Sequence, residues 1–103
     1  MTELSNTFGL TMRNFQKFPE QPDAQELIEF GVSAEKLGYD SLWVWDHILL
    51  GVDPHFPIIE ALSLLTAIAA RTTTINLGSG ILVLPVRNPV ILAKQLSTSS
   101  DVL

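Results

Sequence analysis

The sequence predicts an α/β fold in which helices cover a parallel sheet. Residues 41–45 form a short, almost wholly apolar run, which is typical of a strand buried on both faces of a parallel sheet. Strand-like and helix-like segments alternate three times with short connections, which indicates right-handed crossovers between parallel strands. This order leaves two architectures, a (β/α) barrel or a doubly wound sheet. The G-x-G-x-x-G turn of dinucleotide-binding Rossmann folds does not follow the first expected strand.

The first unit joins a strand expected over residues 7–12 to a helix that begins after Asp23. Asp23 precedes Glu26 by three residues, and in this arrangement the capping side chain accepts a hydrogen bond from a free backbone N–H. Gly38 follows the helix where a left-handed residue is needed to end it. The polar segment 13–22 is expected to be a surface loop. The apolar stripe of the helix is predicted to consist of Leu27, Phe30, Ala34 and Leu37.

The apolar run at residues 41–45 ends in Asp46 and His47. The carboxyl ends of buried parallel strands are where α/β folds place their chemistry, so the two side chains are candidate site residues. The alternative is that Asp46 caps the turn and His47 is a structural histidine. The loop 48–56 is unusually apolar, and it either lines a hydrophobic pocket or closes the end of the strand.

The second helix is expected to begin at Pro57, with Glu60 near its positive end. A third strand is expected over residues 75–84, and it contains the sequence Gly78-Ser79-Gly80. Glycines inside a strand mark a bulge, a close approach of a ligand, or a plain kink of a curved sheet.

The last helix is predicted to begin after Asn88, which suits the N-cap position. Pro89 follows at the first helical position, where its missing N–H is not needed. Residues 90–96 are expected to begin the helix, which should run out over 97–103. Its apolar side is predicted to be Ile91, Leu92 and Leu96.

Composition restricts the class of protein. The chain has 103 residues, a formal net charge of −5 and no cysteine. The negative charge argues against nucleic-acid or anionic-membrane partners, and the lack of cysteine excludes disulfides, zinc–thiolate sites and cysteine nucleophiles. We therefore predict no metal site. No segment resembles a signal peptide, and the apolar run at 58–70 is too short and too interrupted to span a bilayer, so a cytoplasmic location is expected.

The chain is short for the architecture it predicts. An eight-unit barrel needs about 250 residues, so residues 1–103 are expected to form a single partial domain. Such a sheet has open edges, which invite pairing with another chain. We therefore expect either a homodimer or a complementing chain as partner.

Several stretches together resemble the luciferase-like monooxygenase superfamily. They are residues 39–47, which end in Trp45-Asp46-His47, then residues 62–71, 75–81 and 85–89, in the order and spacing of that family. The Trp-Asp-His ending is most similar to the branch that uses the deazaflavin coenzyme F420, with FMN as the alternative cofactor. The resemblance implies the N-terminal three βα units of a TIM (β/α)8 barrel with parallel strands.

The resemblance also implies site residues. His47 would face the substrate near the reactive ring carbon as acid/base or hydrogen-bond donor, and Asp46 would bind the cofactor or orient the imidazole. A bulge at Ser79, Gly80 and Ile81 would press on the cofactor ring through a non-prolyl cis peptide at Gly80–Ile81. Family residues that bind the phosphate and the tail of the cofactor would lie in later strands.

Three functions follow from these expectations. The first is an oxidoreductase that transfers a hydride between coenzyme F420 and a small organic substrate, with His47 as acid/base. The second is an FMN-dependent luciferase-like monooxygenase. The third is a non-catalytic truncated chain that self-associates through open sheet edges.

Overall fold

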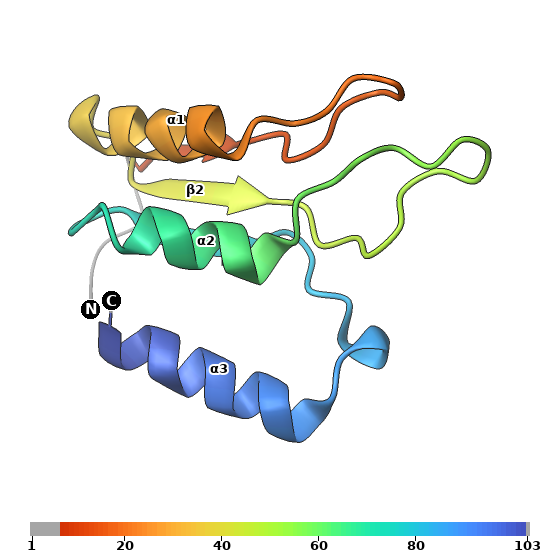
Figure 1. Cartoon of the computed structure of the whole chain (residues 1–103). Helices are drawn as coiled ribbons and strands as arrows, with labels where there is room; N and C mark the ends of the chain where they lie inside the picture. The colour runs from red at the N-terminus through yellow and green to blue at the C-terminus, as the bar shows by residue number, and fades with distance from the viewer. Residues whose placement is uncertain (1–6, 103) are drawn as a thin grey trace.

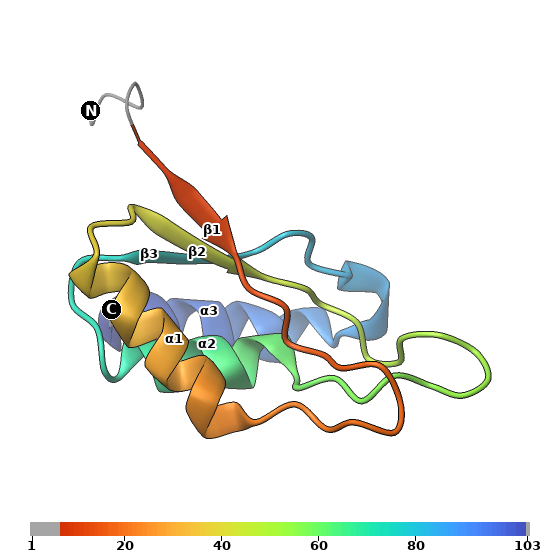
Figure 2. The same cartoon turned by 90° about the horizontal axis from the view of Figure 1, so that it is seen from above.

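A three-stranded parallel sheet forms one layer of the molecule, as Figure 1 and Figure 2 together show. The computed structural model describes residues 7–102. Leu42 in the middle strand stands in register with Leu10 on one side and Leu77 on the other. The parallel pairing and the alternation of strands with helices confirm the predicted α/β class. The strands, in spatial order, are β1 (Gly9–Thr11), β2 (Ser41–Val44) and β3 (Asn76–Ser79).

All the α-helices of the described chain lie on one side of the sheet (Figure 2). They are α1 (Ala24–Lys36), α2 (Ala61–Ala69) and α3 (Pro89–Val102). Leu42 and Val44 of β2 and Ile68 of α2 have no solvent exposure and form the centre of the core. The opposite face of the sheet is not covered by any element of residues 7–102, so the fold has one buried and one open face.

Helix α1 begins as the sequence predicts. The Asp23 side chain accepts a hydrogen bond from the backbone N–H of Glu26 at 3.2 Å. Gly38 follows the helix with a φ of +89°, a conformation that residues with a Cβ rarely adopt. Both predicted ends of α1 are therefore confirmed.

The predicted apolar stripe of α1 is wrong in part. Phe30 and Leu37 are exposed, whereas the buried residues of α1 are Gly31, Val32 and Ala34. The reason is the close packing of α1 on α2, where a Cβ on Gly31 would lie 2.8 Å from Cγ2 of Ile68. The small residue lets the helices approach, and this contact turns Gly31 and Val32 inward.

Helix α2 begins later than predicted. The sequence places its start at Pro57, but Glu60 is the N-cap and the helix begins at Ala61. The Glu60 carboxylate accepts hydrogen bonds from the N–H groups of Leu62 at 2.8 Å and Ser63 at 3.0 Å. A side chain that satisfies two free N–H groups fixes the helix start at this residue.

Strand β3 is shorter than the predicted 75–84. It ends at Ser79. One residue further on, the Gly80–Ile81 peptide bond is cis, as the family resemblance implies. The Gly80 N–H still donates to the carbonyl of Val44 at 3.0 Å. Val44 is the last residue of β2, so the chain beyond Gly80 has no neighbouring strand there to pair with. Gly78 thus lies inside β3, opposite Trp43, whereas Gly80 directly follows the end of the strand.

A 3-10 turn, η1 (Leu84–Val86), leads to α3. The Asn88 side chain accepts hydrogen bonds from the N–H groups of Val90 and Ile91, which confirms the predicted cap. The helix continues to Val102, within the range 97–103 over which it is expected to run out. Of its predicted apolar side, Leu92 is buried while Ile91 and Leu96 are exposed. No helix in the described range is long and apolar enough to cross a membrane.

Candidate functional site

The candidate site lies at the carboxyl end of β2, where successive side chains face opposite ways. Leu42, Val44 and Asp46 are buried, whereas the residues between and after them are exposed. The prediction that this strand is buried on both faces is therefore wrong for this chain. Helices cover only one face, so alternate side chains on the other face reach solvent. The exposed set is Trp43, Trp45 and His47.

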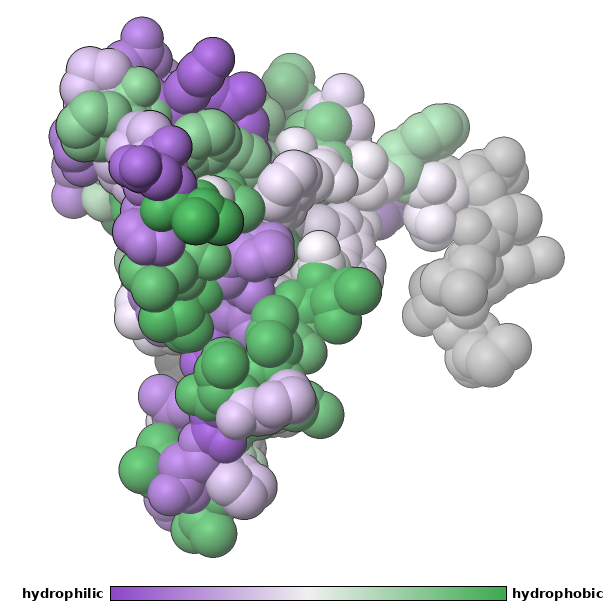
Figure 3. All heavy atoms as spheres, turned by 90° about the vertical axis from the view of Figure 1, so that its right-hand side faces the viewer, coloured by the Kyte–Doolittle hydropathy of each residue, from purple (hydrophilic) through white to green (hydrophobic). Residues whose placement is uncertain are grey.

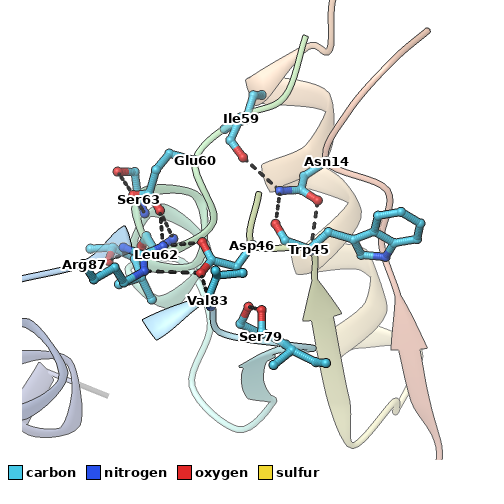
Figure 4. Close-up of polar contacts among 12 residues, drawn as sticks. Asn14, Trp45, Asp46, Ile59, Glu60, Leu62, Ser63, Ser79, Val83 and Arg87 are labelled. Atoms are coloured by element: carbon cyan, nitrogen blue, oxygen red, sulfur yellow. Dashed lines mark hydrogen bonds and ion pairs between the residues drawn. The ribbon is translucent and has the colours of Figure 1, made fainter. Parts of the chain in front are cut away.

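Asp46 points away from the open face, toward the helices (Figure 4). Its side chain is 1% exposed and accepts hydrogen bonds on both oxygens. Oδ2 accepts from the Val83 N–H at 2.8 Å and from Nε of Arg87 at 3.2 Å, and Oδ1 accepts from Nη2 of Arg87. Nearly every acceptor direction of this carboxylate is therefore used by the segment that follows β3.

Arg87 joins three parts of the chain. Besides Asp46 it contacts Glu60, whose Oε2 lies 3.1 Å from Nη2. The hydrogen bond with Asp46 raises the pKa of Arg87, with a further contribution from Glu60, and outweighs partial burial. Burial alone raises the pKa of Glu60, but hydrogen bonds from Leu62, Ser63 and Arg87 together hold it below its ordinary value. Arg87 and Glu60 are thus charged at neutral pH, and the guanidinium lies between the carboxylates of Glu60 and Asp46.

His47 lies on the open side, apart from this cluster. Its ring centroid is 6.3 Å from that of Trp45, and its side chain is exposed. Within residues 7–102 no hydrogen bond joins Asp46 to His47. The structure therefore places the two sequence neighbours in different environments and gives Asp46 no orienting contact with the imidazole.

Trp43 lies flat on the open face of the sheet. A Cβ on Gly78 of β3 would be 2.6 Å from Cζ3 of Trp43, and one on Gly9 of β1 would be 3.1 Å from its Nε1. The indole thus covers the glycine positions of both neighbouring strands. Its Nε1 donates to the Ser41 hydroxyl at 2.9 Å, which fixes the ring along the sheet. The result is a smooth aromatic surface across the three strands.

The predicted bulge residues lie beside this surface. Gly80 follows β3, and its N–H donates to the carbonyl of Val44, the last residue of β2. It therefore lies at the same carboxyl end of the sheet as the segment that carries His47. Ser79 donates its hydroxyl to the Ile81 carbonyl at 2.9 Å, and the Ile81 side chain is 79% exposed. Figure 3 looks at this end of the molecule and shows hydrophobic side chains gathered on it.

Asn14 is a central residue of the site that the sequence does not reveal. It is fully buried, and its side-chain amide donates to the carbonyls of Trp45 at 2.9 Å and Ile59 at 2.8 Å. It also accepts from the Trp45 N–H at 3.0 Å (Figure 4). The neighbouring Phe15 is buried against Trp45, with ring centroids 4.7 Å apart. The expectation that 13–22 is only a surface loop is therefore wrong at Asn14 and Phe15.

The apolar residues of the loop 48–56 differ in exposure, since Leu50 and Phe56 are half-buried and the others are exposed. The expectation that the loop lines a pocket or closes the end of the strand is therefore wrong for Ile48 and Leu49, which are 53% and 66% exposed. Phe56 pairs with Leu50 across the loop and its ring stacks 6.4 Å from Phe15. His55 is held by Gly51, whose carbonyl is 2.6 Å from Nδ1.

This arrangement gives the end of the sheet two chemically distinct sides. The open side offers an aromatic floor, an accessible imidazole and the exposed Ile81. The helix side holds an ion cluster, built around Arg87, that ties the following segment in place. A planar aromatic group suits the open side, whereas no group of three or more possible metal-ligating side chains was found among the described residues.

Comparisons with known proteins agree with this architecture. The family model "Luciferase-like monooxygenase" matches residues 7–102. An F420-dependent glucose-6-phosphate dehydrogenase of Kineococcus radiotolerans is 38% identical over 97 residues, which is 90% of this chain and 28% of that protein. The enzyme of the same name from Amycolatopsis mediterranei is 35% identical over 82 residues, 79% of this chain and 25% of its own length.

A third relative carries the family's own name. It is a luciferase-like monooxygenase of Escherichia coli K12, 30% identical over 97 residues, 89% of this chain and 28% of that protein. The chain thus spans about a quarter of the length of these curated relatives. The family match covers all of the described residues, and the fold and the strand order agree with it. The chain belongs to the luciferase-like monooxygenase family.

Proposed function

We propose that this chain supplies the ring-binding floor and the acid/base histidine of an oxidoreductase that uses coenzyme F420. The observation that carries the proposal is the open face of the sheet, on which Trp43 lies, with Gly80 beside its ring and His47 following the carboxyl end of β2. F420-dependent relatives among the matches favour the deazaflavin over FMN. FMN remains the alternative cofactor, since one relative is named as a luciferase-like monooxygenase.

The residues present fit a planar cofactor ring. Trp43 and Trp45 are 42% and 36% exposed, and the face on which Trp43 lies has no covering element in residues 7–102 (Figure 2). Burying such aromatic surface against a flat ring is favourable, by roughly 25 cal/mol per Å² of apolar area. Ile81, at the edge of the same surface, offers a further apolar contact. When bound, the cofactor supplies the hydride chemistry, and the protein supplies orientation and a proton.

His47 suits the proton-handling role. Imidazole changes charge near neutral pH, so it can give or take a proton during turnover. Its side chain is exposed and lies beside Trp45, with 6.3 Å between the ring centroids, so a substrate at the carboxyl end of β2 could meet it. Asp46 is unsuited to touch substrate, because Arg87 and the Val83 N–H already occupy its two oxygens.

The test uses the Kineococcus relative as host. The region of that enzyme matched by this chain is replaced by the corresponding residues of this chain, and F420 binding and turnover are measured. We expect the chimera to bind F420 and to keep measurable turnover. A chimera that folds with the helical content and melting behaviour of its host but binds no F420 would contradict the proposal. Preference for FMN over F420 would favour the monooxygenase alternative.

His47→Gln in that chimera tests the role of the histidine. General acid–base catalysis contributes about 10²–10⁴-fold, so turnover should fall by that order while F420 affinity changes little. His55→Gln is the matched control, because His55 is also exposed but is held in a loop by Gly51. Equal losses in both variants would remove the acid/base role from His47.

A further inference from the structure

We propose that Arg87 is a positioning residue, which acts through Asp46 and Glu60 to hold the Gly80–Ile81 segment against the end of β2. This inference rests on the proposed function for its catalytic meaning. The contacts themselves are a property of the fold. The Arg87 guanidinium contacts Asp46 at the end of β2 and Glu60 at the start of α2. Asp46 in turn binds the Val83 N–H in the segment after β3.

The contacts form a closed set. Arg87 donates to both oxygens of Asp46, and Asp46 in turn accepts from the Val83 N–H. Val83 and Arg87 lie on either side of the turn η1, so both ends of that turn are tied to the same carboxylate. The segment between the end of β3 and the start of α3 therefore cannot move from β2 without breaking charge-assisted hydrogen bonds.

Glu60 fixes the position of Arg87 from the start of α2. It caps α2 through the N–H groups of Leu62 and Ser63 and also binds Nη2 of Arg87. Because Arg87 bridges two carboxylates from different elements, its position is set by α2 as well as by β2. A planar guanidinium with several fixed donors can make such a bridge, whereas a lysine ammonium is a single point charge.

The segment held in this way carries candidate cofactor contacts. Gly80 and Ile81 are separated from Val83 only by Leu82, and the Gly80 N–H is bonded to Val44 without touching Arg87 or Asp46. Loss of the hydrogen bond from the Val83 N–H to Asp46 should therefore also weaken the hydrogen bond from the Gly80 N–H to Val44. Asp46 itself, predicted from the family resemblance to contact cofactor or imidazole, acts in this view from the other side of the sheet.

Amide hydrogen exchange on the 103-residue chain tests the positioning role. In Arg87→Gln the exchange of the Val83 and Gly80 amides should rise by about tenfold or more, since a hydrogen bond to a charged group contributes enough for that factor. Amides within α1 should keep their exchange rates. Arg87→Lys should restore part of the protection, because it keeps the charge but not the bridge.

Arg71→Gln is the matched control. It removes an exposed arginine that pairs with Glu29 at 2.7 Å, far from the segment in question. It should leave the Val83 and Gly80 amides unchanged. An unchanged Gly80 amide in Arg87→Gln, or an equal rise in α1, would overturn the positioning role. If Arg87→Gln fails to fold, Arg87→Lys decides: raised exchange at Gly80 supports the role, and wild-type exchange overturns it.

The effect of Arg87 on cofactor binding is measured separately, in the chimera. There, Arg87→Gln should weaken F420 affinity by about tenfold by the same reasoning, with partial recovery in Arg87→Lys. Unchanged affinity would overturn the role of Arg87 in cofactor binding while leaving the proposed function intact. A chimera with native Arg87 that binds no F420 would instead defeat the proposed function, and the exchange experiment would still decide the positioning role.

Discussion

Asn14 and Trp45 exchange two hydrogen bonds, one from the Trp45 N–H to Oδ1 of Asn14 at 3.0 Å and one from Nδ2 of Asn14 to the Trp45 carbonyl at 2.9 Å. The side-chain amide thus imitates a strand partner at the point where β1 has ended. Its second donor contact, to Ile59, connects the same position to the segment that leads into α2. One buried amide therefore joins the ends of two strands to the start of a helix.

Asn14→Ala should be strongly destabilising. It would leave the buried backbone groups of Trp45 and the carbonyl of Ile59 without these partners, and the expected loss is about 2–4 kcal/mol in the free energy of unfolding. Urea unfolding measures it. Asn76→Ala, at an exposed position of β3, is the control and should change stability by less than about 0.5 kcal/mol. Similar losses for the two variants would show that the hydrogen bonds of Asn14 are unimportant.

Gly78→Ala should displace the Trp43 ring. The new Cβ would lie 2.6 Å from Cζ3 of Trp43, and the ring can leave the sheet because the open face has room for it. We expect a red-shifted emission of Trp43 in a Trp45→Phe background. The loss of stability should be small, about 1 kcal/mol, at the low end for an overpacked site.

Gly31→Ala is the matched glycine control on the covered face. Its Cβ would meet Ile68 at 2.8 Å and no tryptophan, so stability should fall without a change in emission. Unaltered emission in Gly78→Ala would mean that Trp43 does not lie over β3 as described.

Glu35 should make stability depend on pH in the acid range. Hydrogen bonds from the N–H groups of Thr74, Ile75 and Thr73 lower the pKa of its carboxyl to about 2, from an ordinary value of 4.5. Because the folded-state pKa is depressed, the stabilisation is complete above the ordinary value and is lost as the pH falls from there toward 2. Denaturant midpoints measured across this interval should fall more steeply for the wild type than for Glu35→Gln.

Glu20→Gln is the control for this pH dependence. Glu20 is exposed, and its carboxylate accepts no hydrogen bond from the described residues. Its substitution should leave the acid dependence of the wild type in place. Parallel pH curves for wild type and Glu35→Gln would contradict the assigned role of Glu35.

The 103-residue chain by itself should bind cofactor weakly. Its aromatic floor would cover one side of a ring, and such partial burial has to offset the lost translational and rotational freedom of the ligand. Equilibrium dialysis against F420 and against FMN should therefore detect no binding in the micromolar range. Micromolar binding by the monomeric chain would contradict this expectation and would mean that residues 7–102 already form a sufficient site.

Much of the local structure could be predicted from the sequence. The caps at Asp23 and Asn88 were predicted because their partners are only a few residues away and the chemistry is local. The parallel order of β1, β2 and β3 followed from the alternation of segments. Strand lengths were overestimated, since the end of β3 depends on where β2 ends.

Some residues of the site could be predicted from the sequence and others could not. The sequence marked the positions of Asp46 and His47, and the resemblance marked the cis peptide at Gly80–Ile81. It did not reveal Asn14, because a single asparagine in a polar stretch carries no periodic signal. Arg87 was recognised only as part of a motif, since its partners Asp46 and Glu60 are 41 and 27 residues away.

The sequence by itself determined the class of fold, the order of its elements and the end of β2 as the place of the site. Only the tertiary structure decided which side each residue serves. Helices cover one face of the sheet, so alternate residues of one strand enter different environments: Asp46 joins the ion cluster with Arg87, and His47 faces the open side. Local pattern gives the period of that alternation, but the packing of α1 and α2 decides which half is buried.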